Sequence, residues 1–167
     1  KLEIANEMLK IQAETDPLTG LLNQKRMYPI IEMEIERALR YGGFLSMIMI
    51  DLDDFKRIND IYGHLTGDNV LKAAAVIVKN SVRRSDYAFR YGGEEFLLLL
   101  PSTNIENASA TANRLREEIP ASLKPRVTLS AGISTWKGED ATDFIRKTDA
   151  LLYLAKENGK DRIEKEV

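Results

Sequence analysis

The sequence predicts an α/β sandwich of the α+β class, in which helices flank a central, mostly antiparallel sheet. Apolar segments of strand length predict the sheet, and the segments between them have helical periodicity. Two further short segments flank Gly92-Gly93, an arrangement typical of a β-hairpin. After the N-terminal segment, the expected order is helix, strand, helix, helix, hairpin, helix, strand, helix.

The first two helices are predicted from residue type and apolar spacing. Residues 1–15 are mostly helix formers. Two apolar pairs in this segment lie seven positions apart: Leu2 with Leu9, and Ile4 with Ile11. That spacing suits a coiled-coil seam, although a solvated helix packed on its own domain explains it equally well. Pro17 disfavours helical backbone at Asp16 and ends the segment. A second helix is expected over residues 24–41, where apolar residues recur every four positions.

The remaining elements follow from apolar runs and turn residues. Phe44–Ile50 is a continuous apolar run and is expected to be a buried strand. Residues 54–61 are expected to form a short helix, and residues 63–67, which include two glycines, a loop. The pattern then indicates a helix around 70–82, hairpin strands over Tyr87–Arg90 and Glu95–Leu100, a helix around 105–119, a strand over Val127–Thr135, and a helix around 144–155 that ends near Gly159.

Composition and charge restrict the class of protein. The length of 167 residues suits a linker or signalling helix over residues 1–15, followed by one domain over residues 16–167. A formal net charge of −2 gives no basic footprint, so we expect no nucleic-acid partner. The absence of cysteine excludes disulfides and thiolate metal sites, and it fits a cytoplasmic location. No apolar run approaches the roughly 18 residues of a membrane span.

Carboxylates lie at the ends of two predicted strands. Asp51 directly follows the apolar run that ends at Ile50, and Glu94 and Glu95 follow the hairpin glycines. If the two strand ends meet, they make a divalent-metal site suited to nucleotide phosphates. Hard oxygen ligands, with no cysteine and a single histidine in the chain, favour Mg²⁺ or Mn²⁺ over Zn²⁺.

Asp53 and Asp54 have two interpretations at this point. They could belong to the cation site, because three acids so close in sequence repel one another without a cation or a helix N-terminus. Alternatively, one of them simply caps the short helix that follows. Asp51 is different, because it adjoins an apolar strand and would be partly buried, so its carboxylate needs a partner.

Six short motifs follow one another along residues 16–162, at spacings close to those of a known protein family. They are Asp16-x-Leu18-Thr19-Gly20-Leu21-x-Asn23, Asp51-x-Asp53-x-Phe55-Lys56-x-x-Asn59-Asp60, Gly63-His64-x-x-Gly67-Asp68, Gly92-Gly93-Glu94-Glu95-Phe96, Ser130-x-Gly132 and Asp149-x-x-x-Tyr153-x-Ala155-Lys156. Together they closely resemble the GGDEF domain of bacterial diguanylate cyclases. That resemblance implies a fold similar to the palm of nucleotidyl cyclases and polymerases.

The resemblance also implies an activity, the condensation of two GTP molecules into cyclic di-GMP with release of two pyrophosphates. By the same resemblance, Asp51, the carbonyl of Leu52 and Glu94 would hold two Mg²⁺ or Mn²⁺ ions. Glu94 is in addition a candidate acceptor for the 3′-hydroxyl proton. The family name has aspartate where this chain has Glu94, but either carboxylate occurs in active members. Glu95 would orient its neighbours.

The resemblance also implies which residues would contact the guanine base and the phosphates of GTP. Asn59 and Asp68 match the positions that contact guanine, whose N1–H and N2 amine a carboxylate can accept. The phosphates would be bound by Lys56, Lys156, Lys160 and backbone amides near Phe55. Lys160 stands where an arginine is common in the family. The paired hydrogen bonds that a guanidinium makes to phosphate are therefore replaced by the point charge of an ammonium group. Asn59 could instead be an ordinary turn residue.

A second site is implied by Arg83 and Asp86, which lie three apart and match an inhibitory RxxD site for cyclic di-GMP. An arginine can bind guanine or phosphate through two hydrogen bonds, and an aspartate can accept from the amine edge of guanine. Arg114 would supply a second arginine from a neighbouring domain. The alternative is a salt bridge at a helix end, which is common for such a pair.

Two readings of function follow from the resemblance. The first is an active, homodimeric diguanylate cyclase under an upstream sensory module, because the chain begins at Lys1 like a piece of a longer protein. Membrane attachment of that parent protein stays open. The second is a non-catalytic GGDEF module that binds GTP or cyclic di-GMP. Retention of Asp51, Asn59, Asp68 and Glu94 argues for the first.

Overall fold

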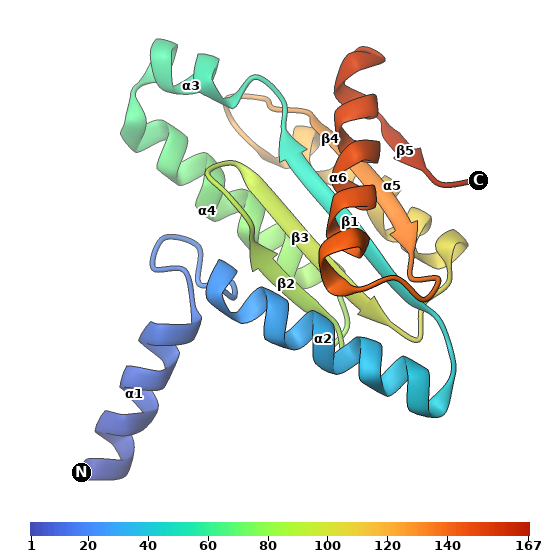
Figure 1. The fold of residues 1–167 in the computed structure, drawn as a ribbon. Helices are drawn as coiled ribbons and strands as arrows, with labels where there is room; N and C mark the ends of the chain where they lie inside the picture. Colours follow the sequence, from blue (N-terminus) through green and yellow to red (C-terminus); the bar gives the residue numbers. More distant parts are fainter.

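The sheet is five-stranded, in a computed structural model that describes all 167 residues (Figure 1). Its strand order is β2-β3-β1-β4-β5, and every neighbouring pair is antiparallel except β4 with β5. The strands are β1 (Leu45–Leu52), β2 (Tyr87–Arg90), β3 (Glu95–Pro101), β4 (Leu129–Thr135) and β5 (Ile163–Lys165). The predicted α+β sandwich with a mostly antiparallel sheet is therefore confirmed.

Helices cover both faces of the sheet and make two separate cores (Figure 1). One face carries α3 (Phe55–Tyr62), α4 (His64–Ser81) and α5 (Ile105–Ser122). The other face carries α2 (Gln24–Tyr41) and α6 (Ala141–Glu157). Strand β1 lies in the middle and is buried along its whole length, because side chains that alternate in direction enter both cores.

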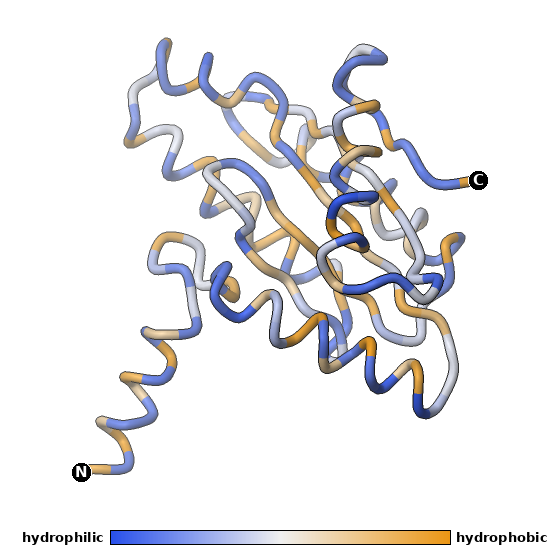
Figure 2. Tube along the Cα trace, in the orientation of Figure 1, coloured by the Kyte–Doolittle hydropathy of each residue, from blue (hydrophilic) through white to orange (hydrophobic).

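The first helix, α1 (Leu2–Glu14), projects away from the rest of the molecule (Figure 1). None of its residues is buried, and Leu2 and Ile4 are 81% and 67% exposed. Apolar and polar residues alternate along it, as Figure 2 shows. The expectation that this helix packs on its own domain is therefore wrong, and the coiled-coil seam stays a prediction.

The expected loop over residues 63–67 is wrong, because α4 begins at His64 and continues through Gly67. Gly67 is buried and lies against Asn59, where an added Cβ would collide with the side-chain oxygen of Asn59. The glycine that looked like a loop residue therefore leaves room for the Asn59 side chain between α3 and α4.

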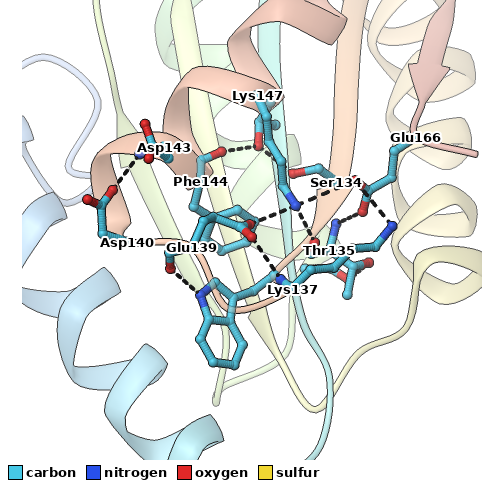
Figure 3. Close-up of polar contacts among 12 residues, drawn as sticks. Ser134, Thr135, Lys137, Glu139, Asp140, Asp143, Phe144, Lys147 and Glu166 are labelled. Atoms are coloured by element: carbon cyan, nitrogen blue, oxygen red, sulfur yellow. Dashed lines mark hydrogen bonds and ion pairs between the residues drawn. The ribbon is translucent and has the colours of Figure 1, made fainter.

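Strand β5 was not predicted, because its three residues are too short for a periodic signal. It pairs with β4, and a polar cluster holds the chain just beyond it (Figure 3). Lys147 of α6 donates to the Thr135 carbonyl at 2.7 Å and lies 2.7 Å from Glu139 Oε1 and 3.5 Å from Glu166 Oε2. Glu166 also accepts the Thr135 N–H at 2.5 Å. These contacts fix the C-terminal segment against β4 and α6.

Candidate active site at the end of strand β1

The two acidic strand ends meet at one edge of the molecule. Asp51 is paired with Glu95 in the register of β1 and β3. One residue on, the Leu52 N–H donates to the Glu94 carbonyl at 3.2 Å. Asp51, Leu52 and Glu94 are therefore neighbours at the same end of the sheet. Glu94 directly follows the glycine turn between β2 and β3.

Asp51 is a buried carboxylate with one cationic partner. The residue is 5% exposed, and its Oδ2 accepts a hydrogen bond from Lys156 Nζ of α6 at 2.6 Å. Burial raises the pKa of Asp51 to about 6, against the opposing effect of Lys156, and the negative charges of Glu94 and Asp53 add to the rise. The site therefore holds more negative charge than one lysine offsets.

The charges around Asp51 affect the groups beside it. Burial raises the pKa of Glu95, and the nearby Asp51 carboxylate adds to the rise. Burial opposes the charge on Lys156, but its hydrogen bond and attraction to Asp51 outweigh burial and raise the pKa of the amine. Lys156 is therefore a stable cation at the edge of a cluster of carboxylates.

Asp53 has a structural position that neither sequence interpretation described. It is 5% exposed and accepts hydrogen bonds from Thr128 Oγ1 at 2.7 Å and Ser130 Oγ at 2.6 Å. It also accepts the Asp161 N–H at 3.0 Å. With three donors bound, this carboxylate ties β1 to β4 and to the segment that follows α6.

Asp54 occupies the N-cap position of α3, but its side chain makes no capping hydrogen bond. Its backbone is in the left-handed region, with φ 53°. Its Oδ1 instead accepts from Lys160 Nζ at 2.6 Å. The expectation that Asp53 or Asp54 caps the helix is therefore wrong for both residues.

The donor set at this edge fits a divalent cation that shares its ligands with a substrate. No three Asp, Glu, His or Cys side chains of the chain lie close enough to form a complete protein site. Mg²⁺, however, is usually held by one or two carboxylates together with substrate phosphates. Asp51, the Leu52 carbonyl and Glu94 are such a partial set, and a cation there would offset the excess negative charge around Asp51.

The residues predicted to contact guanine lie between α3 and α4. Asn59 of α3 is partly buried, and its side chain lies over Gly67 of α4 together with the ring of Phe55. Asp68, the next residue of α4, is exposed. Asn59 and Asp68 are thus on facing helices. A Cβ at position 67 would meet the Asn59 side chain and the Phe55 ring.

The predicted phosphate-binding lysines separate into two groups. Lys156, near the end of α6, pairs with Asp51, and Lys160, just after α6, pairs with Asp54. Both lysines lie beside the carboxylate cluster. Lys56 is exposed on α3 and forms no ion pair. The two lysines on the α6 side are therefore the ones that lie at the end of β1.

Arg90 was missed by the sequence reasoning, and it connects the hairpin to the turn after α1. Its Nη1 donates to both oxygens of Asp16, at 3.0 and 3.1 Å. Its Nε and Nη2 donate to the carbonyls of Gly92 at 3.1 Å and Gly93 at 2.9 Å. One guanidinium thus holds the glycine turn directly before Glu94. The available signal was a pair of opposite charges next to two predicted turns, with Asp16 directly before Pro17 and Arg90 two residues before Gly92.

Arg83 and Asp86 form the salt bridge that the simpler alternative predicted, with Nη2 3.2 Å from Oδ1. Arg83 also donates to the Pro101 carbonyl at 2.8 Å and to Thr103 Oγ1 at 2.7 Å. Arg114 of α5 is exposed and donates to the Ser81 carbonyl at 3.0 Å. These residues are grouped near the end of α4, apart from the carboxylates at the end of β1.

Comparison with known proteins identifies the family of this chain. Residues 13–162 match the family model described as the GGDEF domain of diguanylate cyclases. The chain belongs to the GGDEF family. This GGDEF domain is 42% identical over 160 residues to the diguanylate cyclase DgcP of Pseudomonas aeruginosa, covering 92% of this chain and 24% of that protein. It is 39% identical to DgcM of Escherichia coli, covering 94% of this chain and 39% of that protein.

Solved structures share the fold of the GGDEF domain. The coiled coil and GGDEF domain of DgcB from Caulobacter crescentus, in complex with c-di-GMP, matches with a TM-score of 0.94 and 27% identity over 99% of this chain and 92% of that one. The active GGEEF domain of a diguanylate cyclase from Vibrio cholerae matches with a TM-score of 0.82 and 33% identity over 87% of this chain and 97% of that one.

The GGDEF domain spans about a quarter to two fifths of the length of the curated relatives named above. None of its helices combines the length and the hydrophobicity that a membrane crossing requires.

Proposed function

We propose that this chain is the catalytic domain of a diguanylate cyclase. In each half of the reaction, the 3′-oxygen of one GTP attacks the α-phosphorus of the other, and the bond to the β-phosphate breaks to release pyrophosphate. Two such steps close the ring of cyclic di-GMP. The observation that supports this proposal best is the meeting of Asp51, Leu52 and Glu94 at one sheet end, beside Lys156.

Asp51, the Leu52 carbonyl and Glu94 would hold Mg²⁺ or Mn²⁺, two ions per site. When bound, these ions supply charge stabilisation to the triphosphate and lower the pKa of the attacking hydroxyl. Asp51 suits this role because it is buried, so a charge on it interacts strongly with a cation.

The protein's own groups would bind and orient the substrate. The Glu94 carboxylate accepts the 3′-hydroxyl proton. Lys156 and Lys160 bind the phosphates as point charges, with Lys56 and the backbone near Phe55. Asn59 and Asp68 bind the guanine edge, where the Asp68 carboxylate accepts the N1–H and N2 amine that adenine cannot offer in the same pattern.

Assembly and control complete the proposal. One domain binds one GTP, so two domains must face each other, and we propose a homodimer whose formation an upstream sensory module controls through α1. Cyclic di-GMP would bind at Arg83 and Asp86, with Arg114 of a neighbouring domain, and would hold the two domains in an arrangement that cannot bring their GTP molecules together.

The decisive experiment incubates the protein with GTP and Mg²⁺ and separates the nucleotides by chromatography. We expect cyclic di-GMP and two equivalents of pyrophosphate, no product with EDTA, and no corresponding product from ATP. Specific activity should rise with protein concentration. Binding of GTP without turnover would instead identify a receptor module, and a specific activity independent of concentration would refute the two-domain mechanism.

A further inference from the structure

A polar cleft lies across the segment that follows α6 from the candidate active site. It has a volume of about 310 Å³ and opens between α5 and β5, which pack side by side. Its walls are Ser109, Asn113 and Arg116 of α5, and Arg162, Ile163 and Lys165 at β5. None of these residues belongs to the candidate active site. Asp161 separates the two places, because its N–H donates to Asp53 while its carbonyl accepts from Arg116.

The cleft carries an excess of positive charge. Arg116, Arg162 and Lys165 contribute three cations. The ion pair of Arg116 with Asp161, with Nε 3.2 Å from Oδ1, offsets one of them. Arg162 and Lys165 form no ion pair, and the only hydrogen bond of the Arg162 guanidinium is to the Lys160 carbonyl at 3.2 Å. Three cations and one carboxylate leave two positive charges without a partner.

The polar groups come from two elements that hold them on the same hollow. Ser109, Asn113 and Arg116 lie at spacings of four and three, so they share one face of α5. Arg116 is further fixed by its 3.0 Å hydrogen bond to the Asp161 carbonyl. Single surface lysines and arginines are ordinarily just solvated. Here, three cations surround a cavity whose size lies within the range of small-ligand sites.

We infer that this cleft binds a phosphate-bearing anion. Arginine guanidinium groups match the oxygens of phosphate with paired hydrogen bonds, and the lysine adds a point charge. The Asn113 amide adds a neutral donor to the lining of the cleft. The phosphate could belong to an inorganic anion or to a nucleotide, and both sources share this chemistry.

The test follows backbone and side-chain amide signals of ¹⁵N-labelled protein by NMR, in buffer with EDTA. Inorganic phosphate, pyrophosphate and GMP are titrated in separate experiments. We expect at least one of them to shift signals of residues 109–116 and 162–165 in a saturable way. A stronger effect of GMP identifies a nucleotide ligand, and a stronger effect of pyrophosphate an inorganic one. No saturable shift with any of the three overturns the inference.

Variants separate this cleft from anion binding elsewhere. The double variant Arg162→Ala with Lys165→Ala should weaken binding by roughly tenfold or more, because it removes two charged donors. The matched control, Lys72→Ala with Lys79→Ala, removes the same charge from exposed positions of α4 and should leave binding unchanged.

A third variant, Asn113→Glu, replaces a weak helix former on α5 with a better one and places a carboxylate in the cleft. It should abolish binding while the dispersed spectrum of a folded protein is retained. Equal binding by the control and by the cleft variants would refute the site. Because the readout is local to α5 and β5, the result does not depend on whether the protein makes cyclic di-GMP.

Discussion

Lys156 Nζ lies 2.6 Å from Oδ2 of Asp51, so a helix and the central strand are joined by one short ion pair at the end of the sheet. The pair joins residues 105 positions apart in sequence. It keeps a proposed metal ligand and a proposed phosphate ligand side by side. The strand supplies the carboxylate, and the helix supplies the amine.

Glu94→Gln should abolish cyclic di-GMP synthesis while the domain stays folded. The substitution preserves size but removes the charge that a cation and a proton acceptor require, so we expect a rate loss of roughly 10²-fold or more. Product formation is measured by chromatography, and folding by circular dichroism. Glu157→Gln, an exposed position on α6, is the control and should keep normal activity. Turnover of Glu94→Gln at the normal rate would remove this residue from the site.

Asp68→Asn should weaken GTP binding by roughly tenfold or more. The amide replaces one acceptor oxygen by a donor, and an unpaired polar group costs about 1–3 kcal/mol. Calorimetric titration with a non-hydrolysable GTP analogue and Mg²⁺ measures the effect. Asp60→Asn, which changes another exposed acid on the neighbouring helix α3, should bind normally. Equal affinities of the two variants would place the guanine pocket elsewhere.

Gly67→Ala should destabilise the domain by about 1–3 kcal/mol, because the added methyl group overpacks the contact between α3 and α4. The methyl group would collide with the Asn59 side chain, so the cost should largely disappear in an Asn59→Ala background. Denaturant unfolding of the two single variants and the double variant measures this coupling. Additive effects would show that the two residues do not share the space.

Asp16→Asn should destabilise the domain in a pH-dependent way. Burial alone would raise the pKa of Asp16, but hydrogen bonds from Thr19 and the charge of Arg90 outweigh burial and lower it below 3.8. The stability from this carboxylate is therefore fully present above about pH 3.8 and is lost as pH falls through the lowered pKa. We expect a loss of about 1–3 kcal/mol at pH 7 and a smaller difference at the acid end.

Urea unfolding of wild type and Asp16→Asn between pH 3 and pH 7 tests this expectation. The control is Asp143→Asn, which removes the exposed ion pair with Arg146 and should cost at most about 1 kcal/mol. A constant difference between wild type and Asp16→Asn over the whole pH range would contradict the assignment of the shift to Asp16.

Arg83→Ala should weaken product inhibition and leave the initial rate near normal, because this residue lies apart from the carboxylate cluster. Progress curves with added cyclic di-GMP give the inhibition constant. Arg84→Ala, an exposed neighbour, is the matched control. Inhibition that is equal in both variants would return Arg83 and Asp86 to the role of a structural salt bridge.

Local patterns in the sequence determined the helices, the hairpin and the two acidic strand ends. Backbone geometry gives helices a period of 3.6 and strands a period of 2, and burial of one face displays that period as a pattern of apolar residues. Turn residues mark where elements end, so these features are readable without the fold. The meeting of Asp51 with Glu94 could be anticipated because Asp51 lies near the end of β1 and Glu94 directly precedes β3, and β1 and β3 run antiparallel in the same sheet. The family followed from six motifs in order.

The tertiary structure alone decided what contacts each side chain makes. Asp53 was ambiguous in the sequence because its donors, Thr128, Ser130 and Asp161, lie 75 to 108 residues away. Gly67 was mistaken for a loop residue because the reason for it is a side chain on another helix. Such contacts depend on the distance between elements, which no local period encodes. For that reason, the charge balance of the site and the packing of its helices could be read only from the folded chain.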